Sequence, residues 1–281
     1  MGDLEAKLER LEADNRQVYG WLAKYWDRYV QMPDREASYL FYAKALGIQQ
    51  PHEITLLDAG CGIGEHAIHL ARKGFSVSMC DINQNMVTRA EANAKAARLG
   101  IEAKIASWHN LEAAYGTEQF DVVIQTMSSV ALNLSEEKLR QNFQSIRDVL
   151  KASGKYAFDI RNLAAYKFRE DSEIFPVFEN KWFKVDAALI KRGEAKERER
   201  SLVGIAAHHK PTGKEGIQVV RAWNIYDLRQ MLRETGFDHT AIYFNFDYRF
   251  PQWPDTYPRR LGFNAPAYAK SIQIIAARGT G

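Results

Sequence analysis

Residues 54–64 have the sequence Ile-Thr-Leu-Leu-Asp-Ala-Gly-Cys-Gly-Ile-Gly, and this stretch decides how the rest of the chain is interpreted. An apolar run typical of a buried strand ends in an acid and leads into Gly60, Gly62 and Gly64. Glycine adopts positive φ angles and has no Cβ, so such a loop can turn tightly and let a ligand approach the backbone at the start of a helix. A second apolar run ends in Asp81, whose carboxylate is placed to hold ribose hydroxyls. Together these features predict a nucleoside-binding edge of an α/β sheet.

The spacing of the glycines separates this loop from a dinucleotide fingerprint. Dinucleotide-binding loops follow G-x-G-x-x-G, whereas here single residues separate Gly60, Gly62 and Gly64, after Asp58. The segment resembles motif I of the class I S-adenosylmethionine-dependent methyltransferases, whose acid-Ala-Gly-Cys-Gly-x-Gly loop wraps the amino-acid end of that cofactor. A nucleotide-dependent dehydrogenase and a purely structural glycine turn are the weaker interpretations.

Strand-like and helix-like segments alternate from residue 54 to about residue 160, which is typical of parallel βαβ units. The pattern predicts strands at 54–57, 76–80, 103–106, 120–125, 155–160, 241–246 and 271–276, and helices at 65–73, 85–99, 135–150 and 225–235. The long connection between the last two strands suggests an antiparallel terminal pair. We therefore expect an α/β fold with a Rossmann-like, seven-stranded, mostly parallel sheet and an antiparallel C-terminal strand, which is also the sheet that the resemblance implies.

Four regions are expected along the chain. Residues 1–50 are predicted to form an N-terminal helical lid or arm, 51–162 the S-adenosylmethionine-binding core, 163–222 an inserted substrate cap, and 223–281 the C-terminal completion of the core sheet. Apolar residues near the N-terminus are spaced by three and four, but over fewer than the ~3–4 heptads of a coiled coil. Packing against the protein's own body is therefore favoured, and a homo-oligomer formed through this helix is the alternative.

Composition restricts the partners. The chain has 281 residues and a net charge of +3, from 38 basic and 35 acidic residues, which is too balanced for the electrostatic footprint of a nucleic-acid-binding protein. It shows neither a secretory leader nor an apolar run of ~18 residues that could span a bilayer. Cys61 and Cys80 are interpreted as small buried residues, and no Cys/His cluster has metal-ligand spacing. We expect a cytoplasmic protein with a small-molecule substrate, no metal, and neither nucleic acid nor membrane as a partner.

The resemblance also implies a set of residues that bind S-adenosyl-L-methionine. Asp81 corresponds to the ribose-binding acid, Met86 packs on the adenine, and Ser107 replaces an acid that usually meets the adenine amino group. Tyr19 and Tyr25 belong to a segment that resembles the Tyr-rich lid helix of small-molecule methyltransferases, although core aromatics on an amphipathic helix would give the same pattern. The complete set is Tyr19, Tyr25, Arg35, Asp58, Gly60, Cys61, Gly62, Gly64, Asp81, Ile82, Met86, Ser107, Trp108 and Gln125.

Within the superfamily, the chain is most similar to the glycine and sarcosine N-methyltransferase group. Residues 159–162, Asp-Ile-Arg-Asn, resemble that group's Asp-His-Arg-Asn, whose arginine holds the substrate carboxylate, and Arg35 falls where the group binds the cofactor carboxylate. Isoleucine replaces the motif's histidine, and Leu132 replaces another histidine of the group. The implied substrate-binding residues are Arg161, Asn162, Ser128 and Tyr248.

Three functions remain at this stage. In-line methyl transfer to an amine or amino acid needs alignment and exclusion of water more than a strong base, and Arg161 and Tyr25 are the candidates for that role. O-methylation of a phenolic or natural-product hydroxyl would use a His or Tyr base, for which His208 is the candidate. A macromolecular methyltransferase or a binding module is the third and weakest interpretation. Each candidate also has a purely structural interpretation. Arg161 could form a salt bridge with Asp159 or a nearby acid, Tyr25 could be a core aromatic residue, and His208 could be a surface residue.

Overall fold

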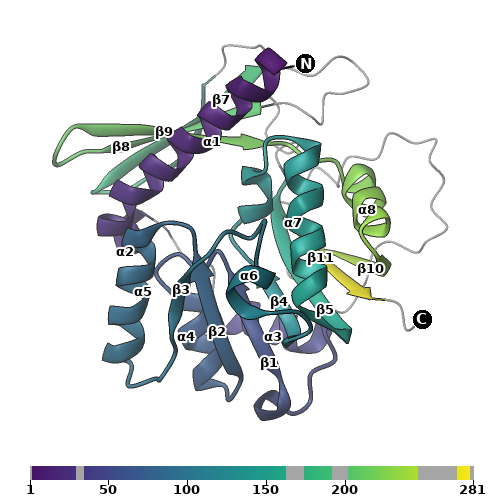
Figure 1. Ribbon diagram of the computed structural model, residues 1–281. Coiled ribbons are helices and arrows are strands. Elements are labelled where there is room, and N and C mark those ends of the chain that lie inside the picture. Colours follow the sequence, from purple (N-terminus) through teal and green to yellow (C-terminus); the bar gives the residue numbers. More distant parts are fainter. Residues whose placement is uncertain (1, 30–34, 163–173, 192–201, 246–270, 279–281) are drawn as a thin grey trace.

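The computed structural model describes residues 2–29, 35–162, 174–191, 202–245 and 271–278. Within them the core sheet has seven strands in the order β10-β11-β5-β4-β1-β2-β3 (Figure 1). Their bounds are β1 Thr55–Ala59, β2 Ser76–Asp81, β3 Ala103–Ile105, β4 Phe120–Gln125, β5 Leu150–Arg161, β10 Phe237–Phe244 and β11 Ser271–Arg278. β11 runs antiparallel to both of its neighbours, and the other described pairs in this sheet are parallel. The expected mostly parallel sheet with an antiparallel C-terminal strand is confirmed.

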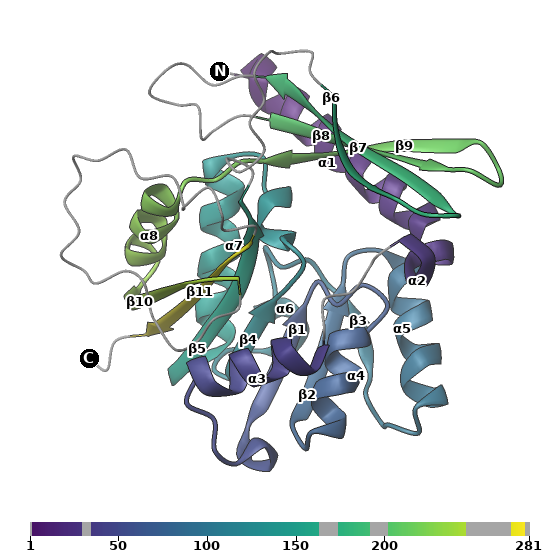
Figure 2. The same cartoon turned by 180° about the vertical axis from the view of Figure 1, so that it is seen from behind.

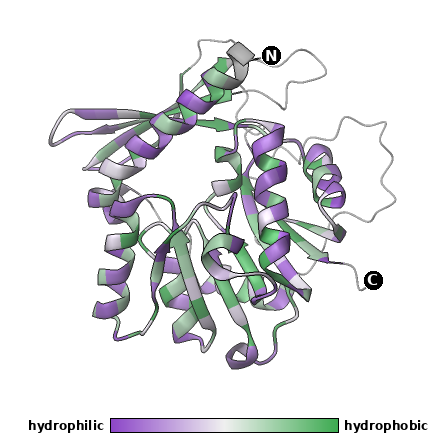
Figure 3. Cartoon of the chain, in the orientation of Figure 1, coloured by the Kyte–Doolittle hydropathy of each residue, from purple (hydrophilic) through white to green (hydrophobic). Residues whose placement is uncertain are grey.

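Helices cover both faces of this sheet. They are α3 Arg35–Ala45, α4 Glu65–Arg72, α5 Gln84–Ala96, α6 Glu112–Tyr115, α7 Glu136–Val149 and α8 Ile225–Glu234. The Ser135 side chain accepts a hydrogen bond from the Lys138 N–H, so the helix α7 begins at the N-cap that the sequence predicts. The strands are largely hydrophobic, while hydrophilic residues lie on the outer sides of the helices (Figure 3).

A second sheet occupies the region predicted as the inserted cap. β6 Ile174–Glu179, β7 Phe183–Lys191, β8 Leu202–His209 and β9 Lys214–Arg221 form an antiparallel sheet in sequence order. Strand-like runs in the sequence at residues 185–191 and 202–208 predict β7 and β8, but the pattern does not predict β6 or β9. Figures 1 and 2 show this second sheet beyond the ends of the core strands, with α1 running alongside it.

The N-terminal helix α1, Gly2–Leu22, joins the two sheets and continues into η1 Ala23–Tyr25 and α2 Trp26–Tyr29. The buried Asn15 amide donates to the Val219 carbonyl (2.8 Å) and accepts from the Val219 N–H (2.7 Å), which fastens α1 to the edge of β9. On its other side, Asn83 and Asn85 donate to carbonyls of α1 at 2.9 and 3.0 Å. Packing against the protein's own body is therefore observed, and the homo-oligomer stays a prediction. No described helix is long and apolar enough to cross a membrane.

Candidate active site

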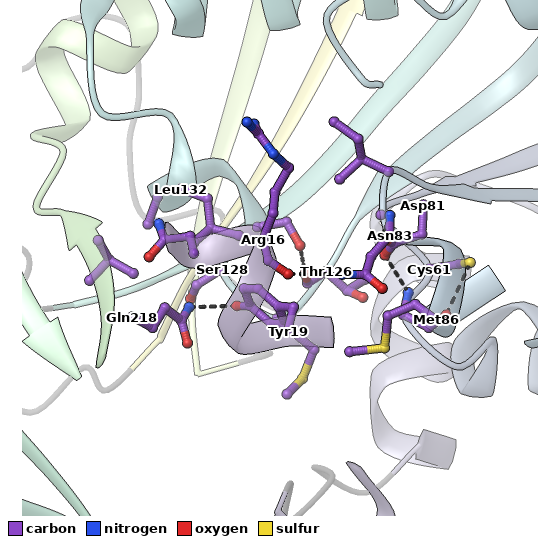
Figure 4. A pocket seen from close by; sticks show the side chains of 18 of the residues that line it. Arg16, Tyr19, Cys61, Asp81, Asn83, Met86, Thr126, Ser128, Leu132 and Gln218 are labelled. Atoms are coloured by element: carbon purple, nitrogen blue, oxygen red, sulfur yellow. Dashed lines mark hydrogen bonds between the residues drawn. The ribbon is translucent and has the colours of Figure 1, made fainter. Parts of the chain in front are cut away.

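A cavity of about 680 Å³ lies between the carboxyl ends of the core strands, α1, α2 and the second sheet (Figure 4). This volume is within the ~300–1,000 Å³ typical of sites for small molecules and cofactors. The lining comes from segments far apart in sequence, including the glycine loop, the end of β2, Arg161, β9 and the turn between β4 and the 3-10 helix η3, Ser129–Leu132. Because the strands are parallel, their carboxyl ends meet at one edge, where α/β folds bind ligands.

The glycine loop forms one wall of this cavity. Gly60, Gly62 and Gly64 have φ angles of +91°, +55° and +80°, which L-residues with a side chain rarely adopt. A Cβ on Gly60 would lie 2.9 Å from a ring carbon of Trp108, whereas one on Gly62 would have nothing closer than 4.0 Å. The backbone at Gly62 is therefore open to a ligand, while Gly60 permits close packing of the indole.

Asp81 ends β2 and fixes the glycine loop from the neighbouring strand. Its two carboxylate oxygens accept hydrogen bonds from the N–H groups of Gly62 (3.0 Å) and Asn83 (2.8 Å). Burial raises the pKa of Asp81 to about 6, although these N–H donors lower it. At neutral pH the carboxylate is ionised, and its remaining lone pairs can accept further hydroxyl donors from the cavity.

Asp58 lies deeper, at the end of β1, and does not line the cavity. Neither of its oxygens has a hydrogen-bond partner among the described residues, although the nearby Ala67 N–H of α4 lowers its pKa. Burial, followed by the charge of Asp81, raises the pKa of Asp58 to about 7. Asp58 is therefore buried behind the cavity wall and does not face a ligand.

A three-residue network follows β3, and the sequence analysis did not anticipate it. The Asn133 Nδ2 donates to the Val130 carbonyl (3.0 Å), so its Oδ1 must accept from the His109 Nε2–H (2.7 Å). The His109 Nδ1 is then an acceptor, and the Ser107 hydroxyl lies 3.3 Å from it. Burial lowers the pKa of His109, which keeps the imidazole neutral at neutral pH. Both ring nitrogens are thus engaged.

The β4–η3 turn forms the cavity wall next to Arg161. Met127 and Ser128 have φ angles of +62° and +61°, in the left-handed region that is costly for residues with a Cβ. Asp159 accepts hydrogen bonds from both of their N–H groups, at 2.8 and 3.1 Å. The Arg161 N–H donates to the Ser128 hydroxyl oxygen (2.7 Å). Asp159 therefore holds the turn, and no ion pair joins it to the Arg161 side chain.

The structure brings most of the predicted site residues to the cavity. Eleven of them line it, and these are Tyr19, Gly60, Cys61, Gly62, Asp81, Ile82, Met86, Ser107, Trp108, Ser128 and Arg161. In addition, the Tyr19 hydroxyl accepts a hydrogen bond from the Gln218 amide, which links α1 to β9 inside the cavity (Figure 4).

Six other predicted residues are described but do not line the cavity: Tyr25, Asp58, Gly64, Gln125, Asn162 and His208. Tyr25 stacks on His209 with ring centroids 4.2 Å apart, and His208 lies at the surface, 2.8 Å from Glu215. Gln125 is fully buried and accepts a hydrogen bond from the Tyr156 hydroxyl. The side chain of Arg35 and the whole of Tyr248 lie outside the described residues. In the described ranges, no group of three or more His, Cys, Asp or Glu could hold a metal ion.

Comparison with known proteins gives a consistent result. Residues 56–154 match the model of a methyltransferase domain family. A Geobacillus sp. (strain WCH70) protein assigned as a methyltransferase is 37% identical over 107 residues, covering 38% of this chain and 42% of that protein. A glycine/sarcosine N-methyltransferase of Aphanothece halophytica is 30% identical over 149 residues, covering 53% and 55%. The chain thus spans about half the length of the curated relatives it matches.

Among solved structures, an S-adenosylmethionine-dependent methyltransferase from Clostridium acetobutylicum has a TM-score of 0.68 at 15% identity, over 93% of this chain and 99% of that one. A sugar N-methyltransferase from Streptoalloteichus has a TM-score of 0.59 at 17% identity, over 91% and 92%. At such identities these two likenesses show the fold. Residues 56–154 are thus similar to a methyltransferase domain, and the chain has the fold of these two solved methyltransferases.

Proposed function

We propose that this protein is an S-adenosyl-L-methionine-dependent methyltransferase that methylates the nitrogen of a small amine or amino-acid-like molecule. One observation carries the proposal: the glycine loop with Asp81 and the guanidinium of Arg161 line the same cavity. A site for a nucleoside and a site for an anionic acceptor therefore adjoin. The family match and the related methyltransferases support the same class of reaction.

The lining fits the proposed cofactor. Asp81 retains lone pairs for ribose hydroxyls, and the open backbone at Gly62 lets the amino-acid end of the cofactor approach. Met86, Ile82 and Trp108 give an apolar surface to an adenine. The Ser107 hydroxyl lies toward the His109 Nδ1, and its oxygen accepts a hydrogen bond from the His109 backbone N–H (3.2 Å), so one lone pair remains to accept another. A hydrogen-bond acceptor is therefore retained at the position where the resemblance implies an acid.

The chain's own residues would align the acceptor and keep water out. When bound, S-adenosylmethionine supplies a methyl group on a positively charged sulfur. Arg161 would hold an anionic group of the acceptor, with Ser128 and the left-handed turn fixing the start of its side chain. The aromatic rings of Tyr19, Trp26 and Tyr29 line the α1–α2 side of the cavity and exclude solvent there. Alignment in a dry cavity is the main requirement of an in-line displacement.

The protonation and hydrogen bonding of the polar groups in the cavity favour a nitrogen atom over a hydroxyl oxygen as the methyl acceptor. Burial raises the pKa of Tyr29 to about 12 and the pKa of Tyr19 further, so neither phenol is ionised at neutral pH. His109 has both ring nitrogens engaged, and His208 lies away from the cavity. His66 also lines the cavity, and its Nδ1 lies 3.3 Å from the Thr126 hydroxyl. A neutral amine already carries a free lone pair and needs none of these groups as a base. O-methylation remains the alternative function.

Isothermal titration with S-adenosylhomocysteine, followed in the same cell by amino acids, amines and phenols, tests this proposal. Binding of S-adenosylhomocysteine and of amines in the titration, together with methyl transfer to amines in a separate assay with S-adenosylmethionine as the donor, supports it. Transfer to phenols alone would establish the O-methyltransferase, and no binding would overturn the methyltransferase function itself.

Arg161→Lys supplies the second arm of this test. We expect a higher Michaelis constant for an acidic substrate with cofactor affinity nearly unchanged, because lysine cannot make the bidentate contact. Arg140→Lys is the matched control, since Arg140 lies on the surface of α7 and pairs with Glu136 and Glu234. Unchanged substrate kinetics in Arg161→Lys would make Arg161 a structural residue.

A further inference from the structure

The second sheet and α2 place an apolar wall over the part of the cavity next to Arg161. Its side chains come from five separate elements, and they are Tyr29, Phe178, Val185, Ile205 and Val220. The Tyr29 ring meets Phe178 edge-on, with centroids 5.8 Å apart, and most of these side chains are buried. The wall is therefore a packed surface, and its cavity side is hydrophobic.

Arg161 is the cation beside this wall. Its charge acts on the hydroxyl groups of both Tyr19 and Tyr29, where it opposes the increase in pKa that burial causes. Its guanidinium forms no ion pair with any residue in the described ranges. Arg16 and Lys138 also line the cavity. Positive charge from Arg161 adjoins the apolar surface of the wall, because it acts on the Tyr29 hydroxyl.

These two features set requirements for the acceptor molecule. A carboxylate would satisfy the guanidinium, but an acid as small as glycine would leave the apolar wall in contact with water. Each methylene that fills a hydrophobic pocket changes specificity by ~10–200-fold. An apolar substituent next to the acceptor nitrogen would therefore be selected strongly.

We propose that the preferred acceptor is a carboxylic acid with an apolar body, such as a branched-chain or aromatic amino acid, and that glycine and sarcosine are poor acceptors. This inference rests on the proposed function, and it gives this chain a substrate class different from that named for its glycine/sarcosine relatives. Arg161 binds the carboxylate, and the wall binds the side chain of the acceptor.

The wild-type protein tests this substrate class without any mutation. Leucine is compared with asparagine, which has a similar size but a polar side chain, with isoamylamine, which lacks the carboxylate, and with glycine. Methyl transfer is measured, together with titration of each molecule into protein saturated with S-adenosylhomocysteine. We expect kcat/KM for leucine to exceed that for each of the other three by at least ~10-fold.

A matched pair of substitutions then locates the selectivity. Ile205→Thr alters the cavity wall on β8, whereas Ile217→Thr alters an exposed position on the adjacent strand β9, on the opposite face of the same sheet. We expect Ile205→Thr to lower kcat/KM for leucine by ~10-fold or more and to leave glycine unaffected, and Ile217→Thr to change neither. Affinity for S-adenosylhomocysteine should stay the same in both variants.

The outcomes distinguish failure of the proposed substrate class from failure of the proposed function. Absence of S-adenosylhomocysteine binding would overturn the proposed function. Normal binding with glycine or isoamylamine accepted as well as leucine, or with none of the acids methylated, would overturn the substrate class and leave the methyltransferase function standing. If Ile205→Thr does not fold, the wild-type comparison alone decides.

Discussion

Protonation of Asp81 should weaken cofactor binding in a defined pH window. The carboxyl group has a pKa of about 6 in the free protein, and its ionised form is the better acceptor for two ribose hydroxyls. Hydrogen bonds to a charged group contribute ~1.5–3 kcal/mol each, against ~0.5–1.5 kcal/mol for neutral pairs. The ionised state should therefore bind the ribose more tightly by about 2–3 kcal/mol, or roughly 30- to 150-fold.

The sign of the effect follows from this preference. A ligand that favours the ionised form lowers the pKa of Asp81 in the complex, by roughly 2 units for this energy difference. Affinity is then complete well above pH 6 and is lost as the pH falls through 6 toward the pKa of the complex. Between pH 8 and pH 5 the dissociation constant of S-adenosylhomocysteine should rise about tenfold. The ligand itself has no group that titrates between these values.

Isothermal titration at several pH values measures this step, with circular dichroism to verify that the protein stays folded at pH 5. Asp81→Asn should bind weakly at pH 8 and show almost no pH dependence. Asp58→Asn is the matched control, because Asp58 ends the adjacent strand and does not line the cavity. It should retain the tenfold step. A flat wild-type profile, or a step that persists in Asp81→Asn, would refute the ribose assignment.

Two further substitutions test how the cavity is built. Gly60→Ala should lower the free energy of unfolding by about 1–3 kcal/mol and weaken S-adenosylhomocysteine binding, because φ is +91° and the new Cβ would lie 2.9 Å from an indole carbon. Gly213→Ala, at φ +66° with nothing within 4 Å, should affect stability less and leave binding intact; equal effects in both would argue against the steric explanation. Asn15→Ala should remove the two hydrogen bonds to Val219 and destabilise the protein by about 2–4 kcal/mol, with faster amide exchange along β9, whereas Asn85→Ala, which removes one exposed bond, should cost about 1 kcal/mol or less. Unchanged exchange in Asn15→Ala would contradict the role of α1 as a connector.

The strands and helices of the core sheet could be predicted from the sequence because the patterns that indicate them lie within short segments of the chain. The apolar run of β4 predicted residues 120–125, the bounds that the structure has, and the Ser135 cap marked the start of α7. The predicted strand at 155–160 was too short, since β5 begins at Leu150 and pairs with β4 through a register shift. Such an irregularity arises from the pairing between two strands. The hydrophobic periodicity of a single segment therefore does not predict it.

Contacts between distant segments account for what the sequence did not reveal. Asn15 and Val219 are 204 residues apart, so nothing near either residue predicts that α1 docks on β9. The interpretation of Arg161 as a partner of Asp159 fails for a similar reason, because the oxygens of Asp159 bind the backbone of another strand's turn. The sequence identified residues at the ends of strands, but only the fold shows which of them face the cavity.

Two of the acids at the carboxyl edge of the sheet hold the walls of the cavity in place through hydrogen bonds to the backbone. Asp81 holds the glycine loop, and Asp159 holds Met127 and Ser128 in a left-handed conformation that would otherwise cost ~1–2 kcal/mol per residue. Burial raises the pKa of both acids to about 6, so each is ionised at neutral pH and makes charge-assisted bonds to backbone N–H groups. These bonds offset the strain of the turn and hold the glycine loop in place. A cofactor and an acceptor would then meet walls that are already formed, and less of their binding energy would be spent on ordering the protein.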